Sequence, residues 1–321
     1  MKLLVSWMRE LGSYISREFH YTMRDLVEKH GWRHVEPWLV SKNATSSTAL
    51  LEMLGDVPRI VLFWETYDLF NTVQPVFRAL GSRQALFADD LHLLWGKEDH
   101  RDAKLRAFSN SDVVLTSYAY VFDEFYPELR GRKKAIWIPH AASPDFILPF
   151  NDEPEDTLLL SGFVGALYPL RCRVKQLHEQ GCREIFYHRH PGYSESYDVA
   201  GDGRVGPGYA GIIHRFRAGF SDALTFRYVV AKYFEIPATG ALLVADDAVR
   251  EPLQELGFLG NVHYVPVCAD NLERKIRYVL DENNRAEIDD IRRRGQELVL
   301  SRHTTSHRAS LIDATCTHSL Q

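Results

Sequence analysis

The sequence of 321 residues contains few of the features that crosslink a chain or anchor it in a membrane. Its four cysteines form no CxxC pair and no zinc-like spacing, so we interpret them as reduced thiols of a cytosolic protein. No apolar run approaches the ~20 residues that span a bilayer. The apolar start, MKLLVSWMRELG, is interrupted by charge too soon for a signal peptide. These absences predict a cytoplasmic protein and leave peripheral membrane contact open.

The sequence also lacks a strong charge of one sign. The formal net charge is −5, which argues against a broad nucleic-acid-binding face but permits a local basic pocket. No GxGxxG motif follows the first apolar run, which disfavours a dinucleotide-dependent dehydrogenase. A content of 45% hydrophobic and 25% charged residues is typical of a globular protein. The length allows two domains of ~150 residues.

Short apolar runs alternate with helical patterns along the chain. In the first half we predict six strands: Lys2–Trp7, Val35–Val40, Arg59–Trp64, Arg83–Ala88, Asp112–Ser117 and Ala135–Pro139. After a polar, proline-bearing segment at 149–156 the alternation resumes. There we predict strands at Leu158–Gly165, Glu184–His188, Ala241–Ala245 and Val262–Pro266. Such alternation predicts mostly parallel sheets with helices on both faces.

Two helices near the end of the chain are also expected. Asp270–Glu273 has the pattern of a capping box for a helix that follows it, and a long helix is predicted from about 284 to 301. We expect two doubly wound, Rossmann-like domains, at 1–150 and 151–302. A last helix, at 303–321, is expected to return to the first domain. A cleft between two such domains is the default ligand site.

The segment from Val229 to Asp247 carries a carboxylate close to two cations. Glu235 lies near a predicted helix-to-strand junction, with Arg227 and Lys232 before it. Open α/β sheets bind ligands at the ends of their strands, so this segment is a candidate for contact with a charged ligand.

Several motifs of the second half, in order, resemble the group 1 glycosyltransferases of the GT-B fold, and most closely the spore-maturation-type branch. They are Gly162–Gly165 with Arg171, Lys232–Gly240, Leu253–Gly257, Asp270–Leu280 with Arg285, and Gly295–Arg308. The first half is similar only in architecture, with looser matches at Phe63–Asp68 and Asp89–His92.

The resemblance implies transfer of a sugar from a UDP-, GDP- or dTDP-linked donor to a hydroxyl of a glycan or other acceptor. The second domain would hold the donor and the first would hold the acceptor, with no cofactor or metal required. Glu235 matches the carboxylate that binds the donor ribose in this family. The stereochemical outcome stays open, because Arg227 stands where retaining members often carry a glutamate. A nucleotide-sugar epimerase or hydrolase of the same fold, and a non-catalytic nucleotide-sugar-binding partner, remain alternatives.

Donor binding needs fixed positive charge, because negative charge builds on the leaving diphosphate. Arg171, Arg227 and Lys232 are candidate cations. Ser221 is expected to cap a helix beside the diphosphate, and Gly165 to let the backbone approach the ligand. Near the nucleobase we expect His188, Tyr193 and Tyr209.

The acceptor hydroxyl of an inverting transfer needs a general base. Asp90 and Glu65, then His92, are the candidates, because they follow predicted strands at the edge where open α/β sheets place their sites. The HxH pair at His188 has no further ligand at metal spacing, so no metal site is predicted.

Overall fold

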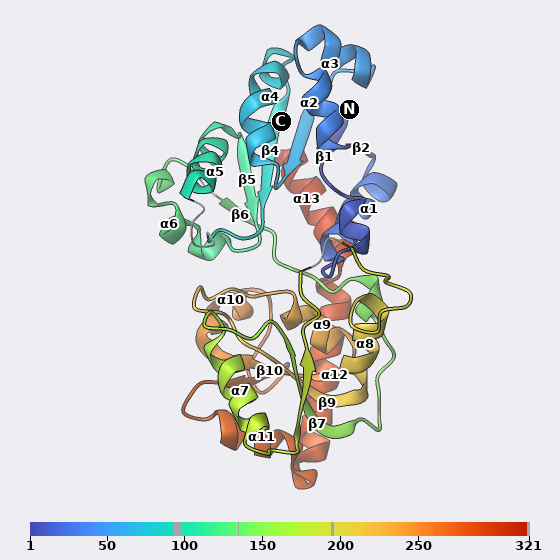
Figure 1. Cartoon of the computed structure of the whole chain (residues 1–321), viewed down its shortest axis with the longest axis vertical. Helices are drawn as coiled ribbons and strands as arrows, with labels where there is room; N and C mark the ends of the chain where they lie inside the picture. The colour runs from blue at the N-terminus through green and yellow to red at the C-terminus, as the bar shows by residue number, and fades with distance from the viewer. Residues whose placement is uncertain (93–97, 134, 194–195, 320–321) are drawn as a thin grey trace. The chain divides into compact units, whose positions relative to one another are not determined.

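The computed structural model describes residues 1–92, 98–133, 135–193 and 196–319. The chain forms two compact units (Figure 1). Unit 1 comprises Met1–Gly12, Phe19–Pro139 and Ser306–Gln321, and unit 2 comprises Ser13–Glu18 and His140–Thr305. The division therefore falls near residue 140, within the predicted 1–150 domain, and assigns a short early segment to unit 2.

Unit 1 is built on a six-stranded parallel sheet in the order β2-β1-β3-β4-β5-β6. Its strands are β1 (Lys2–Val5), β2 (Trp32–Val35), β3 (Ile60–Trp64), β4 (Arg83–Ala88), β5 (Val113–Thr116) and β6 (Ala135–Trp137). Its helices are α1 (Glu18–His30), α2 (Pro37–Asn43), α3 (Ser47–Leu54), α4 (Tyr67–Ala79), α5 (Glu98–Asn110), α6 (Phe122–Phe125) and α13 (Thr305–Ser319). The strand order reverses between β1 and β3, which makes that pair the switch point of the sheet.

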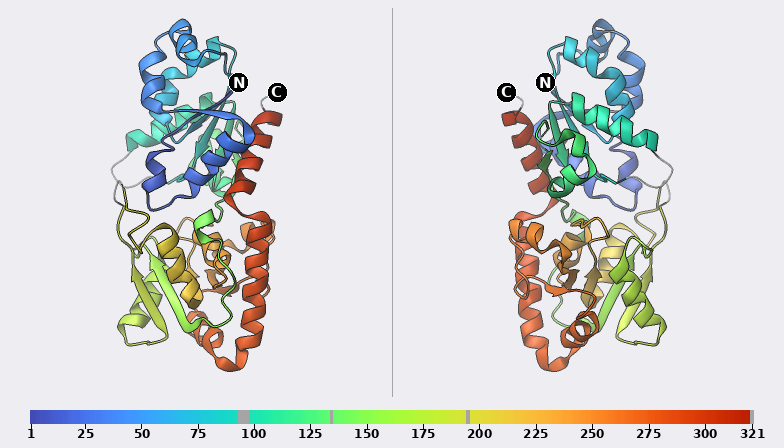
Figure 2. Two further views of the ribbon diagram at one scale, coloured as in Figure 1. Left: turned by 90° about the vertical axis from the view of Figure 1, so that its right-hand side faces the viewer. Right: turned by 90° about the vertical axis from the view of Figure 1, so that its left-hand side faces the viewer.

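Helix α13 returns to the core of unit 1, where it lies against the sheet beside α1 (Figure 2). Ala309, Ile312 and Cys316 are fully buried among side chains of α1 and the sheet. Asp313 on the same helix accepts hydrogen bonds from Lys2 Nζ and, at 2.7 Å, from Trp32 Nε1. The last helix thus completes the first hydrophobic core.

Unit 2 contains a five-stranded parallel sheet in the order β11-β10-β9-β7-β8. Its strands are β7 (Glu155–Gly162), β8 (Ile185–Arg189), β9 (Phe216–Ser221), β10 (Leu242–Asp246) and β11 (Val265–Val267). Its helices are α7 (Pro169–Glu179), α8 (Gly206–Arg215), α9 (Lys232–Ala238), α10 (Arg250–Glu255), α11 (Leu272–Leu280) and α12 (Arg285–Arg302). Here the order reverses between β7 and β9.

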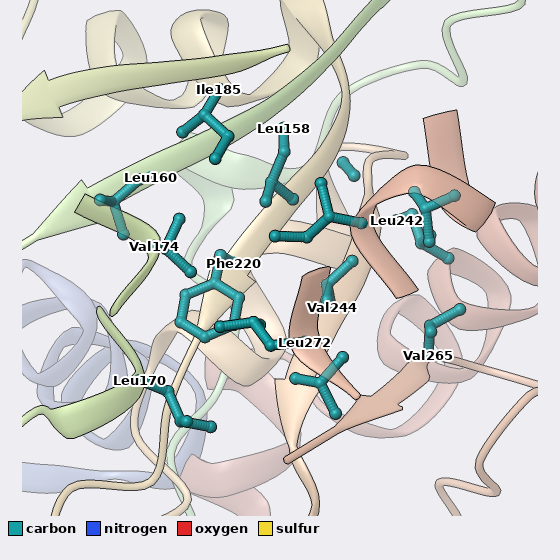
Figure 3. Close-up of a cluster of buried hydrophobic side chains, with 14 of the residues drawn as sticks. Leu158, Leu160, Leu170, Val174, Ile185, Phe220, Leu242, Val244, Val265 and Leu272 are labelled. Atoms are coloured by element: carbon teal, nitrogen blue, oxygen red, sulfur yellow. The ribbon is translucent and has the colours of Figure 1, made fainter. Parts of the chain in front are cut away.

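The core of unit 2 explains why its helices lie where they do. Alternate strand residues such as Leu158, Leu160 and Phe220 point to one face, where they meet Val174 of α7 and Leu272 of α11 (Figure 3). On the other face α9 packs against β9, and a Cβ on Gly219 would lie 3.1 Å from Ile236. Burial on both faces leaves the ends of the strands as the open positions of the sheet.

The fold class is confirmed, but three local predictions were wrong. The segment Val35–Val40 is not a strand, because β2 ends at Val35 and Pro37 begins helix α2. The predicted capping box does not form, since α11 has Asn271 at its N-cap and no side-chain cap bond. Strand β9 was not predicted.

Candidate functional site

A pocket opens at the carboxyl end of the unit 2 sheet, at its switch point. It is lined from the ends of β7 and β8, from the start of α7, from the segment before and within α9, and from the early segment of unit 2. The residues are Ile15, Ser16, Gly162, Phe163, Tyr168, Arg171, His188, His190, Pro191, Tyr193, Arg204, Tyr209, Val230, Ala231, Lys232 and Glu235. We call this the unit 2 pocket. Its position is where open α/β sheets bind ligands.

Two cations converge on the glycine that ends β7. A Cβ on Gly162 would lie 2.7 Å from Cε of Lys232 and 3.0 Å from Nη1 of Arg171. Gly162 also has φ +90°, a backbone conformation that favours glycine. The absence of a side chain there lets the ammonium and the guanidinium approach each other. Together they give the pocket wall a concentrated positive charge.

Arg171 is held in place from several sides. Its backbone N–H donates to Asp222 at 3.0 Å, its Nη1 donates to the Phe163 carbonyl at 3.2 Å, and its guanidinium lies over the Tyr168 ring. The Nε atom lies 3.4 Å from Asp222 in an ion pair of two buried side chains. Burial raises the pKa of Asp222, and the charge of Arg171 opposes that rise. These contacts fix the guanidinium before any ligand arrives.

Lys232 begins α9 and contacts two groups of the pocket. Its Nζ donates to the Tyr209 hydroxyl at 2.7 Å and lies 3.8 Å from a carboxylate oxygen of Glu235. Burial lowers the pKa of Lys232, but Tyr209 and Glu235 outweigh that effect, so the pKa lies above its usual value. The lysine therefore carries its charge at neutral pH.

Glu235 is buried beside Lys232, with a second buried pair close by. Burial, and then the negative charge of Glu18, raise the pKa of Glu235, while Lys232 and His140 lower it. Glu18 accepts hydrogen bonds from His140 Nδ1 at 2.8 Å and from the Ala141 N–H at 2.6 Å. Glu235 is only 8% exposed, so its acceptor oxygens lie in surroundings of low dielectric constant, where hydrogen bonds to ligand hydroxyls are strong.

Histidines and aromatic rings form the other side of the pocket. Burial, with Lys232, Arg171 and His188 nearby, lowers the pKa of His190 to about 4, so its ring is neutral at pH 7. Burial, then the charge of Lys232, also lowers the pKa of His188. The His190 ring contacts Tyr193, which is 63% exposed, and both residues line the pocket.

The structure brings together six of the nine residues predicted to bind a donor. These are Arg171, His188, Tyr193, Tyr209, Lys232 and Glu235. Gly165, Ser221 and Arg227 are not among the lining residues. A Cβ on Gly165 would meet the Phe163 ring, and Arg227 is exposed with φ +58°.

The expected helix cap at Ser221 was wrong. Ser221 is the buried last residue of β9, and α9 does not begin until Lys232.

Several pocket residues were missed by the sequence reasoning. Gly162 is part of the motif Gly162–Gly165, and the signal for its role was a glycine that ends a strand before a candidate arginine. His190 stood in the same short run as His188. Ile15 and Ser16 gave no signal at all, because their place in the pocket depends on contacts distant in sequence. One such contact is the Arg17–Asp145 ion pair at 2.7 Å.

The three candidate bases lie together in unit 1, after β3 and β4. Glu65 has φ +51°, and its Oε1 accepts from the Asp89 N–H at 3.4 Å. Desolvation by the surrounding protein, and then the negative charges of Asp89 and Asp90, raise the pKa of Glu65 to about 8. The Glu65 side chain is exposed, so solvent screens part of this effect. His92 Nδ1 lies 3.7 Å from Asp90, and burial, with Lys104, lowers the pKa of His92.

Within the described part of the chain, no group of three or more His, Cys, Asp or Glu side chains is arranged to hold a metal ion. Nor does any helix among those residues have the length and apolarity to cross a membrane.

Comparisons with known proteins agree with this architecture. Residues 175–314 match a family model described as glycosyl transferase-like. No curated protein matches the sequence. A sucrose-phosphate synthase from Thermosynechococcus elongatus superposes with a TM-score of 0.68 at 13% identity, with 98% of each chain covered. Anabaena HepE in complex with UDP-glucose gives 0.59 at 10% identity, covering 99% of this chain and all of HepE.

A third structure, of a trehalose-6-phosphate synthase, gives a TM-score of 0.61 at 9% identity, with 98% of each chain covered. At such identities the likeness shows the fold alone. That fold is GT-B, with two Rossmann-like domains, as the sequence predicted. Over residues 175–314 the chain resembles glycosyl transferase-like proteins, in agreement with the resemblance predicted for the second half. The spore-maturation-type branch stays a prediction.

Proposed function

We propose that the protein transfers a sugar from a nucleotide-sugar donor to a hydroxyl of a glycan or other acceptor. The bond between the anomeric carbon and the diphosphate oxygen breaks, and a bond to the acceptor oxygen forms. The nucleoside diphosphate leaves with the electron pair. The acceptor proton passes to a base of the protein or to the leaving diphosphate.

One observation supports this proposal most directly, the convergence of Arg171 and Lys232 over Gly162 with Glu235 beside them. A guanidinium fork and an ammonium are the groups that bind a diphosphate. A buried carboxylate next to them suits the paired hydroxyls of a ribose. Few ligands other than a nucleoside diphosphate carry a diphosphate directly next to a ribose with paired hydroxyls.

A uridine donor is the first choice within this proposal. The solved HepE structure of the same fold contains UDP-glucose. In this chain the exposed Tyr193 and the neutral His190 offer flat surfaces and hydrogen bonds to a base. GDP- and dTDP-sugars remain the comparison donors, and membership of the spore-maturation-type branch is part of this proposal.

The two cations also support transfer without a metal ion. Arg171 and Lys232 are fixed in position, and Lys232 keeps its charge, so they supply the positive charge that the leaving diphosphate requires. We expect EDTA to leave the transfer rate unchanged.

Substitution of Glu235 tests the donor site. Glu235→Gln keeps the shape but removes the charged acceptor, so UDP affinity by titration calorimetry should fall ~10- to 100-fold, equal to the ~1.5–3 kcal/mol of hydrogen bonds to a charged group. Wild-type protein should release UDP from UDP-sugar only when a suitable acceptor is present. Unchanged UDP affinity in the variant would sink the assignment. UDP release without acceptor would favour the epimerase or hydrolase, and binding without any turnover the non-catalytic partner.

The unit 1 carboxylates are proposed as the source of a general base. Only a deprotonated carboxylate accepts a proton, so a Glu65 base with a pKa of about 8 makes kcat/KM rise as the pH rises through that value. Glu65→Gln should then lower kcat ~100-fold and remove this rise. If Asp90 is the base instead, Asp90→Asn slows transfer and Glu65→Gln leaves the rate close to the wild-type value. Wild-type rates in both variants would exclude both carboxylates as the base and leave only His92 at this edge.

A further inference from the structure

A second depression opens in unit 1 at the carboxyl edge of its sheet, and the proposed function does not use it. It contains Trp7 after β1, Trp38 and Ser41 on α2, and Asp68 on α4, over a floor that includes Pro37 and Leu69. We call it the tryptophan pocket. The residues follow β1, β2 and β3, the strands around the switch point of unit 1. Ligands of open α/β sheets bind at such crevices.

Two large apolar side chains are left open there. Trp7 is 43% exposed and Trp38 is 56% exposed, whereas the sheet tryptophan Trp64 is 2% exposed. Both exposed indoles line one depression, so they form a shared apolar surface. Contiguous exposed apolar surfaces mark interaction sites, whereas apolar side chains that are exposed singly need no such explanation.

The polar groups around these rings are also unengaged. Within the described residues, no ion pair or side-chain hydrogen bond involves the Asp68 carboxylate, and the indole N–H groups of Trp7 and Trp38 have no acceptor. Apolar ring faces, free N–H donors and a free carboxylate acceptor therefore lie together. A sugar ring presents the matching set, with an apolar C–H face and hydroxyls that both donate and accept.

The charge of the pocket separates a saccharide from other ligands. Among the residues that line the tryptophan pocket, Asp68 is the only charged one, so the lining itself is negatively charged. A carboxylate repels phosphates, so a nucleotide or an anionic lipid surface is disfavoured. A neutral saccharide is accommodated without that cost.

We infer that the tryptophan pocket binds a saccharide, as a subsite for the sugar chain of the acceptor. The role of the saccharide as an acceptor rests on the proposed function, but saccharide binding itself requires neither donor nor turnover. It makes the acceptor a glycan rather than a lipid or protein hydroxyl.

Binding is tested without donor, by saturation-transfer NMR and titration calorimetry. The probes are trisaccharides of glucose, galactose, mannose and N-acetylglucosamine. At least one should bind the wild type, with the strongest transfer to C–H protons of one ring face. Trp7→Ala and Trp38→Ala should each weaken binding ~10-fold, the ~1.4 kcal/mol expected of a lost stacking contact. Trp38→Phe should retain most of the affinity.

Two controls keep the result specific. Phe186→Ala removes an aromatic ring that is 41% exposed in unit 2, and it should leave the saccharide affinity at the wild-type value. UDP affinity should match the wild type in every tryptophan variant, and circular dichroism should show that each one folds. Where transfer is measurable, Trp7→Ala and Trp38→Ala should raise the acceptor KM and leave kcat near the wild-type value.

The inference would be overturned if no trisaccharide binds, or if both alanine variants bind it as the wild type does. It would also be overturned if the wild type sediments with phosphatidylcholine–phosphatidylglycerol vesicles and the alanine variants do not, without a change in saccharide binding. Saccharide binding that depends on Trp7 and Trp38, without binding of UDP, GDP or dTDP in unit 2, would support the subsite and refute the proposed function. UDP binding and sugar transfer with an unchanged acceptor KM in both variants would support the proposed function and refute the subsite.

Discussion

At Gly162 two requirements for glycine coincide. The φ of +90° disfavours any side chain, and a Cβ would meet Lys232 and Arg171 at 3.0 Å or less. The first requirement concerns the stability of the backbone, and the second concerns the placement of the cations. Because only the second depends on the neighbours, the two effects can be separated by experiment.

Gly162→Ala should weaken UDP binding strongly and destabilise the protein, because Lys232 must shift and the backbone is strained. The matched control is Gly181→Ala, where φ is +93° but nothing lies within 4 Å of the added Cβ. Both variants should lose ~1–2 kcal/mol of unfolding free energy from strain, measured in urea. Only Gly162→Ala should lower UDP affinity in calorimetry. Equal UDP affinity in the two variants would contradict the described crowding.

At the scale of elements, the loop between β9 and α9 determines where Lys232 and Glu235 lie. It contains two non-glycine residues in the left-handed region, Leu224 with φ +56° and Arg227 with φ +58°. Its backbone is held by hydrogen bonds from the Thr225 N–H to the Leu167 carbonyl and from the Tyr228 N–H to the Ala223 carbonyl. Strain of this kind persists only where the surrounding structure compensates for it, and it clusters at functional sites.

Arg227→Gly should relieve this strain and raise the unfolding free energy by up to ~1 kcal/mol. UDP affinity should stay at the wild-type value, because the exposed Arg227 does not line the unit 2 pocket. Arg227→Ala removes the guanidinium but keeps the strain, so it should change neither the free energy of unfolding nor the UDP affinity much. A fall in UDP affinity in both variants would restore Arg227 as a donor-binding residue.

Strand β9 shows why an element can escape sequence reasoning. Its centre contains Arg217 and Gly219, which weaken both the apolar and the β-propensity signals. Arg217 is fully buried and is paired with Asp156 and Glu282, so its charge is compensated by residues distant in sequence. Gly219 is required by the close approach of Ile236. Both reasons exist only in the folded chain.

At the scale of the whole molecule, each unit has its own hydrophobic core. Ile312 of α13 belongs to the core of unit 1, and Val174 of α7 belongs to the core of unit 2. A ligand that binds only the folded form of one unit raises the stability of that unit. Calorimetry can therefore assign the unfolding transitions.

Ile312→Ala should lower the Tm of one transition in scanning calorimetry, and Val174→Ala should lower the other. Each loses ~1–4 kcal/mol for a cavity in a well-packed core. UDP should raise only the transition that Val174→Ala lowers. If UDP raised only the Tm of the transition that Ile312→Ala lowers, UDP would bind unit 1, and the proposed donor site in unit 2 would be contradicted.

The sequence by itself determined the fold class and most elements, because hydrophobic periodicity and the punctuation by glycine and proline are local. It also pointed to Lys232 and Glu235 as candidates, since charged residues close to a predicted helix end are visible in one dimension, and to Arg171 through the resemblance. It did not determine the strand order, and so it did not locate the two switch points. These arise from parallel pairings between strands such as β7 and β9, which lie far apart in the chain.

Only the tertiary structure decided which side chains share a pocket. Ile15 reaches the unit 2 pocket because its segment is tied to unit 2 by contacts across more than 120 residues, such as Arg17 with Asp145. Trp7, Trp38 and Asp68 meet because three parallel strands end at one edge. Side-chain proximity of this kind depends on packing between distant segments, and no local pattern encodes it.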